Sequence, residues 1–80
     1  MKARVHVTLK PAVLDPQGSA IASALTHLGF EGVGAVRQGK LIEIDLTESD
    51  PAAAKAQVDA MCKKLLVNEV IETYSLELAD

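Results

Sequence analysis

The chain has 80 residues, enough for a single domain over residues 1–80. A domain of this size buries only about 60% of the surface that its unfolded chain exposes, so its own core is small and association is expected. Hydrophobic residues make up 49%, with one phenylalanine, one tyrosine and no tryptophan. The formal net charge of −3 argues against a nucleic-acid binder. A single cysteine, no signal-peptide pattern and no long apolar run together predict a cytoplasmic protein that does not bind membranes.

The first predicted strand covers residues 2–10, where apolar and polar residues alternate with a period of two. Asp15 and Pro16 then predict a helix start, because the aspartate can accept from the free amides of the first turn and proline needs no donor at the first helical position. The apolar residues of this helix have amphipathic spacing, and Gly29 is suited to end it. They are Ala20, Ile21, Ala24, Leu25 and Leu28.

A second, weaker strand is predicted over residues 33–37. Gln38-Gly39 is then typical of a hairpin turn in which the glycine supplies a positive φ. A third, half-buried strand follows over residues 41–47. Asp50-Pro51 repeats the capping pair and opens a second helix, whose predicted apolar stripe is Ala54, Val58, Met61, Cys62 and Leu65.

The last strand is expected from Val70 to about Leu78. Val70, Tyr74, Leu76 and Leu78 share one face, but Glu72 interrupts it, so the register of this strand stays open. The order βαββαβ predicts an α+β fold, a ferredoxin-like two-layer sandwich with two helices on one face of a four-stranded antiparallel sheet.

The other face of this sheet is expected to be mostly polar, and the small core favours its use in association. Its expected residues are Arg4, His6, Thr8, Leu41, Glu43, Asp45, Ile71, Thr73 and Glu77. The charge is also uneven along the chain, since residues 1–40 carry +3 and residues 41–80 carry −6. Complementary charges on neighbouring strands can pair and account for this asymmetry.

No set of reactive side chains converges in the sequence. His6 has no cysteine or serine partner and is expected at the surface or an interface, whereas Cys62 lies on an apolar stripe and is expected to be buried. One cysteine and two distant histidines do not have metal-ligand spacing, and no glycine-rich phosphate loop is present. The sequence therefore predicts no catalytic, cofactor or metal residues in this chain, and a binding or assembly module.

Several blocks of the sequence resemble the PurS family: Val13-Leu14-Asp15-Pro16-Gln17-Gly18, Val36-Arg37-Gln38-Gly39-Lys40 and Met61-Cys62-Lys63-Lys64-Leu65-Leu66-Val67-Asn68. The resemblance implies the non-catalytic small subunit of phosphoribosylformylglycinamidine synthase in de novo purine biosynthesis. It implies a homodimer or higher homo-oligomer that bridges the synthetase subunit PurL and the glutaminase subunit PurQ and assists ammonia transfer. ATP, Mg²⁺ and glutamine are then used by the complex, and none of them is bound by this chain.

Two regions are expected to project beyond the sheet, the segment 13–18 before the first helix and the hairpin 37–40. They are the predicted contact regions for these partners. Their residues are Val13, Leu14, Gln17, Arg37, Gly39 and Lys40. The alternative is a free-standing ACT-like module, which has the same βαββαβ order and senses a small metabolite. Tight binding of an amino acid or nucleotide by the isolated chain would favour that alternative.

Overall fold

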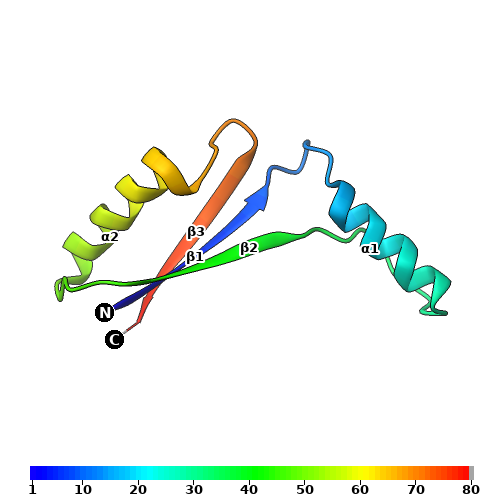
Figure 1. The fold of residues 1–80 in the computed structure, drawn as a ribbon, viewed down its shortest axis with the longest axis horizontal. Helices are drawn as coiled ribbons and strands as arrows, with labels where there is room; N and C mark the ends of the chain where they lie inside the picture. Colours follow the sequence, from blue (N-terminus) through cyan, green and yellow to red (C-terminus); the bar gives the residue numbers. More distant parts are fainter. Residues whose placement is uncertain (80) are drawn as a thin grey trace.

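The computed structural model describes residues 1–79 and contains one three-stranded antiparallel sheet and two helices (Figure 1). In chain order the elements are β1 (Lys2–Leu9), α1 (Pro16–His27), β2 (Gly39–Asp45), α2 (Pro51–Met61), the π-helical turn η1 (Cys62–Leu66) and β3 (Glu72–Ala79). Strand β1 is central, with β2 on one side and β3 on the other. Within residues 1–79 neither helix combines the length and the apolarity needed to cross a membrane.

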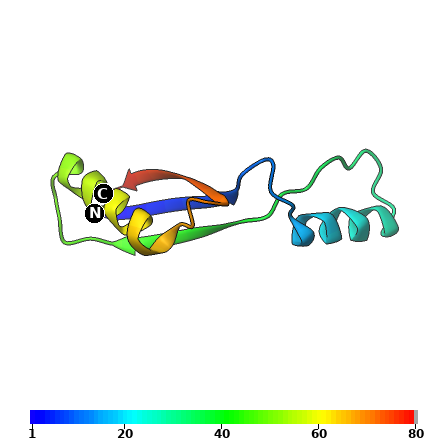
Figure 2. The same cartoon turned by 90° about the horizontal axis from the view of Figure 1, so that it is seen from above.

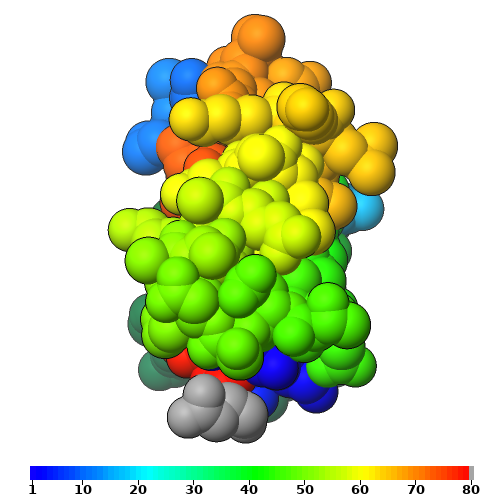
Figure 3. All heavy atoms as spheres, turned by 90° about the vertical axis from the view of Figure 1, so that its left-hand side faces the viewer, coloured from blue at the N-terminus to red at the C-terminus, as the bar shows by residue number. Residues whose placement is uncertain are grey.

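The core lies between the central strand and the second helix. Val5 pairs with Ile42 on β2 and with Leu76 on β3, so the apolar residues of all three strands face the same side. Helix α2 and η1 cover this side, and their atoms hide most of the sheet in Figure 3. The buried apolar cluster consists of Ala3, Val5, Val7, Val58, Cys62 and Val67.

Helix α1 does not cover the sheet, so the expected layer of two helices is wrong for the single chain. It extends beyond the end of the sheet at which β1 ends and β2 begins (Figure 2). Gly18 is its only buried residue, and Ile21 and Leu28 are 39% and 74% exposed. The linker after Leu9 carries the chain away from the sheet, whose apolar face is already occupied by α2.

The expected fourth strand is also absent from the described residues. Residues 33–37 form an irregular segment that returns from α1 to β2, and Gln38-Gly39 is not a hairpin turn. Positive φ angles occur at Gly29 and Gly32 instead, whereas Gly39 is the first residue of β2 and pairs with Thr8. Because β2 pairs directly with β1, residues 33–37 run outward to α1 and have no strand beside them.

The second helix ends in a π-helical turn that changes which residues face the core. The predicted burial of Cys62 is confirmed, and burial raises the pKa of its thiol, with a smaller contribution from the charge of Asp59. Leu65, however, is 83% exposed, while Leu66 packs against the core. A π turn places more residues in each turn than an α-helix, which rotates Leu65 away from the position that α-helical spacing predicts.

The last strand begins at Glu72, two residues later than expected. Its core-facing side contains Tyr74, Leu76 and Leu78, as the alternation predicted, and pairing with β1 fixes the register. Val70 lies in the preceding turn and is 81% exposed. The Tyr74 hydroxyl donates to the Asp59 carboxylate at 3.0 Å and so links β3 to α2.

The π turn predicts that truncation of two neighbouring leucines to alanine destabilises the protein to different extents. We expect Leu66→Ala to lower the free energy of unfolding by about 1 to 3 kcal/mol, because it removes core contacts. The matched variant Leu65→Ala should change it by less than about 0.5 kcal/mol, since that side chain is exposed. Urea denaturation measures both, and the reverse order of costs would contradict the π-helical register.

Candidate functional site

The structure brings the two predicted contact regions together at the base of α1. We call this place the junction, defined as residues 10–18 and 36–40. Its two segments leave and rejoin the sheet at the same end, and they are joined by hydrogen bonds between side chains and backbone. The junction is therefore one site, although its two parts are about twenty residues apart in the sequence.

Asp15 is the only charged residue among the described ones that is buried, with 6% of its surface exposed. One carboxylate oxygen, Oδ1, accepts from the Gly18 amide at 2.9 Å, which confirms the predicted helix cap. The other oxygen, Oδ2, accepts from the Gln38 amide at 2.8 Å and ties α1 to the start of β2. The hydrogen bonds from Gln38 and Gly18 lower the pKa of Asp15 below its usual value of 3.8.

The second link in the junction comes from Arg37. Its Nη2 atom donates to the backbone carbonyl oxygens of Lys10 and Val13, each at 3.0 Å. The guanidinium group is thus engaged within the chain, even though the side chain is exposed. This link could not be predicted from the sequence, because backbone carbonyl acceptors leave no signal in the identity of Lys10 or Val13.

Two glycines allow the segments of the junction to approach closely. A Cβ atom at Gly18 would overlap the carbonyl oxygen of Val36, and one at Gly39 would lie 2.6 Å from the carbonyl oxygen of Val7. Neither glycine has a positive φ. Both positions therefore require glycine for its small size, which corrects the expected role of Gly39 in a turn.

The remaining predicted contact residues also belong to the junction. Leu14 is 79% exposed and Gln17 is exposed, while Val13 is half-buried. Lys40 lies 3.9 Å from the Glu72 carboxylate, so this cation has a partner within the chain. A shallow hollow at the junction is lined by Val7, Leu9, Asp15, Gln17, Gln38, Gly39, Lys40 and Glu72. The role of these residues as partner contacts stays a prediction.

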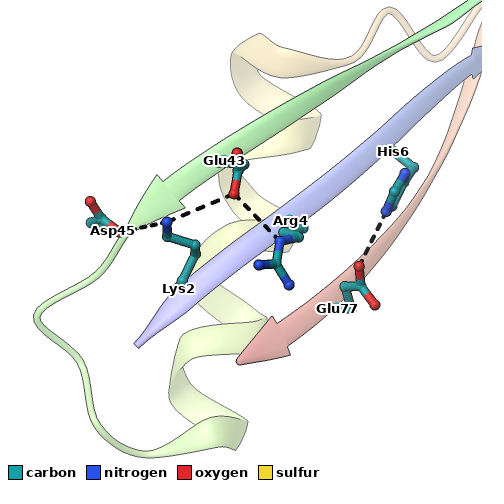
Figure 4. A network of polar contacts seen from close by, with 6 residues as sticks. All are labelled: Lys2, Arg4, His6, Glu43, Asp45 and Glu77. Atoms are coloured by element: carbon teal, nitrogen blue, oxygen red, sulfur yellow. Dashed lines mark hydrogen bonds and ion pairs between the residues drawn. The ribbon is translucent and has the colours of Figure 1, made fainter. Parts of the chain in front are cut away.

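A second polar surface covers the sheet face opposite α2 (Figure 4). Basic side chains of β1 pair there with acidic side chains of the flanking strands. The pairs are Lys2–Glu43 at 3.8 Å, Lys2–Asp45 at 4.0 Å, Arg4–Glu43 at 3.4 Å and His6–Glu77 at 3.3 Å. Each side chain in these pairs is more than 40% exposed, so each pair contributes little to stability. The pairs explain much of the charge asymmetry, because the positive first strand lies between two acidic ones.

Geometry places this chain in the class of small α+β interaction modules. It has one well-packed core, an exposed helix held out from the sheet, and a cross-linked junction at the base of that helix. Among residues 1–79, no group of three or more histidine, cysteine, aspartate or glutamate side chains is arranged to hold a metal ion.

Comparison with known proteins identifies the family. The family model for PurS, phosphoribosylformylglycinamidine (FGAM) synthase, matches residues 2–80. The subunit PurS of phosphoribosylformylglycinamidine synthase from Synechocystis is 52% identical over 75 residues, which are 94% of this chain and 75% of the relative. The chain belongs to the PurS family, and the predicted resemblance is confirmed.

Solved structures of the family have the same fold. Bacillus subtilis PurS is 44% identical and superposes with a TM-score of 0.87, covering 99% of this chain and 98% of that one. A chain of PurLQS from Thermotoga maritima is 30% identical, with a TM-score of 0.88 and coverage of 95% and 93%. The position of α1 beyond the sheet is thus part of an arrangement that aligns closely with PurS structures.

The close approach at Gly18 predicts that an added methyl group is costly there. We expect Gly18→Ala to lower the free energy of unfolding by about 1 to 3 kcal/mol, because the Val36 backbone must move. Gly34→Ala is the control, since no atom lies within 4 Å of a Cβ at that position, and it should not destabilise the protein. Equal costs for the two variants in thermal unfolding would contradict the described packing.

The lowered pKa of Asp15 predicts a specific pH dependence. Because the folded-state pKa lies below 3.8, the ionised carboxylate stabilises the fold fully above that pH, and the contribution is lost as the pH falls through the folded-state pKa. Wild type should therefore exceed Asp15→Asn in stability at neutral pH, and the difference should shrink in acid. Urea denaturation across this range measures the difference, with the exposed Asp45→Asn as control. A difference that does not change with pH would contradict the assignment.

Proposed function

We propose that this chain is the assembly subunit of phosphoribosylformylglycinamidine synthase, a glutamine-dependent ligase. It binds a PurL-type synthetase subunit and a PurQ-type glutaminase subunit, holds them together and assists ammonia transfer between them. The observation that carries this proposal is the similarity to a chain of PurLQS from Thermotoga maritima over 95% of this chain. ATP, Mg²⁺ and glutamine are used by the partner subunits, and this chain binds no cofactor of its own.

The contribution of such a subunit is positional. Ammonia released at one site is captured at another only if it does not escape into water, and holding the two sites together makes capture an effectively local event. This role requires surfaces that bind two partners and no reactive group. The exposed α1 and the side chain of Leu14, which is part of the junction and 79% exposed, are suited to it.

A homodimer or higher homo-oligomer is also part of the proposal. Isolated helices shorter than about 12 to 15 residues are only marginally stable in water, and α1 has just 12 residues with its apolar stripe uncovered. A second copy can cover this stripe, and β2 and β3 each have a free edge that another chain can extend. The four-stranded layer with two helices expected from the sequence would be completed only in such an assembly.

Two further features belong to this proposal. Residues 1–80 form a single domain, which is supported by the one buried cluster that the described residues contain. The location is cytoplasmic, where a free cysteine such as Cys62 stays reduced.

The proposal predicts that the chain stimulates a glutamine-dependent reaction. PurL-type and PurQ-type subunits from the same source are mixed with and without this chain, and amidine formation is measured with glutamine or with ammonium as the nitrogen source. We expect the chain to raise the glutamine-dependent rate, to leave the ammonium-dependent rate nearly unchanged, and to co-elute with both subunits. No stimulation and no co-elution would reject the proposal. Tight binding of an amino acid or nucleotide by the isolated chain would instead support an ACT-like sensor.

Leu14 allows a direct test of the predicted contact region. We expect Leu14→Ala to weaken binding to the partner subunits at least about fivefold, because it removes an exposed apolar anchor, and to leave stability unchanged. Leu65→Ala is the matched control, since Leu65 is 83% exposed on η1 and is not one of the residues of the junction. Titration calorimetry or biolayer interferometry measures the affinities. Equal affinities for the two variants would remove Leu14 from the contact region.

A further inference from the structure

Among residues 1–79, helix α1 is attached to the sheet only through the junction. No residue of α1 belongs to the buried apolar cluster, so hydrophobic packing within the single chain does not fix its direction. The helix and the segment 28–35 that follows it are here called the α1 arm. Two chain segments connect this arm to the sheet, and the contacts between these segments decide how freely the arm can swing.

Three hydrogen bonds cross from one segment to the other. Asp15 accepts from the Gln38 amide at 2.8 Å, and Arg37 donates to the carbonyl oxygens of Lys10 and Val13 at 3.0 Å each. A fourth bond, from the Gly18 amide to Asp15, joins this set to the first turn of the helix. The set thus links the linker after β1, the start of α1 and the entry to β2.

The charges of Asp15 and Arg37 also favour each other. Asp15 is buried and ionised, and the nearby positive charge of Arg37 favours its ionised form, as do the amides that it binds. One nitrogen of the planar Arg37 guanidinium group, Nη2, donates to two carbonyl oxygens of the linker. Removal of Asp15 breaks the link to the Gln38 amide, and removal of Arg37 breaks both bonds to the linker carbonyls, so either change loosens the connection between the two segments.

We infer that Asp15 and Arg37 are positioning residues that fix the direction in which the α1 arm leaves the sheet. Arg37 then acts on assembly through the arm and not by contact with a partner, which changes its role from the contact residue predicted from the sequence. This inference rests on the proposed function, since a fixed direction matters only if the arm must meet a surface on another chain. An arm that swings loses affinity because its freedom must be given up on binding.

The direction of the arm can be measured in the isolated protein. Spin labels are placed at Ser23→Cys on α1 and Lys55→Cys on α2, both exposed positions, while the buried Cys62 is not accessible to the label. Labelled chains are diluted with excess unlabelled chain so that only distances within one chain contribute. We expect a narrow distance distribution, which Arg37→Ala and Asp15→Asn broaden.

The same variants are then tested for binding to the PurL-type and PurQ-type subunits. We expect Arg37→Ala to weaken binding at least about fivefold and to leave the amide exchange of α2 and β1 unchanged, which separates loss of position from loss of fold. Both residues act through one junction, so their effects on affinity should not add. The double variant should bind the partner subunits about as tightly as the single variant that binds more weakly. The control is Arg4→Ala, the other arginine of the chain, which bonds to Glu43 on the sheet face and should not broaden the distribution.

Each result decides one part of the inference. A distribution that stays narrow in Arg37→Ala would overturn the positioning role, and weaker binding together with a narrow distribution would make Arg37 a contact residue. If unmodified protein fails to bind either subunit, the proposed function fails, but the distance measurement still decides whether the junction fixes the arm.

Discussion

The structure depends on the burial of one central strand. Strand β1 has β2 and β3 on its sides and α2 across one face, so Val5 and Val7 are almost completely shielded from water. A chain of 80 residues has enough apolar surface to complete this one cluster and little more. Once α2 and η1 occupy the apolar face, α1 has no surface of its own chain to pack against. The extended shape of the molecule follows from this limit.

Polar interactions at the junction, and not hydrophobic packing, hold α1 to the rest of the chain. The base of α1 is held by a buried carboxylate, an arginine that binds two carbonyl groups, and a glycine that allows close backbone contact. Such bonds depend on geometry far more than apolar contact does, which suits a segment whose direction matters. Asp15 has two roles here, since one oxygen caps the helix and the other ties down the start of β2. A residue that the sequence marks as a helix cap is thus also the main link between the two halves of the junction.

Features governed by short-range rules could be predicted from the sequence. The period-two alternation of β1, both Asp-Pro helix starts and the burial of Cys62 depend on neighbours a few residues away, and each agrees with the structure. The position of α1 could not be predicted, because an apolar stripe shows that a helix needs a partner surface without showing which chain provides it. Leu65 was misplaced because the π turn breaks the period on which the prediction rested. At the site, all six predicted contact residues belong to one junction, but the bonds of Arg37 to backbone carbonyls had no signature in the sequence.

The central claim is that α1 is left uncovered by its own chain and is covered by association. Amide hydrogen exchange over a dilution series of the isolated protein tests it most directly. The account predicts that protection of α1 falls as the protein is diluted, whereas protection of β1 and α2 stays constant because their core is internal to each chain. Protection of α1 that equals that of α2 at the lowest concentration would show that the helix is stabilised within the single chain and would contradict the account.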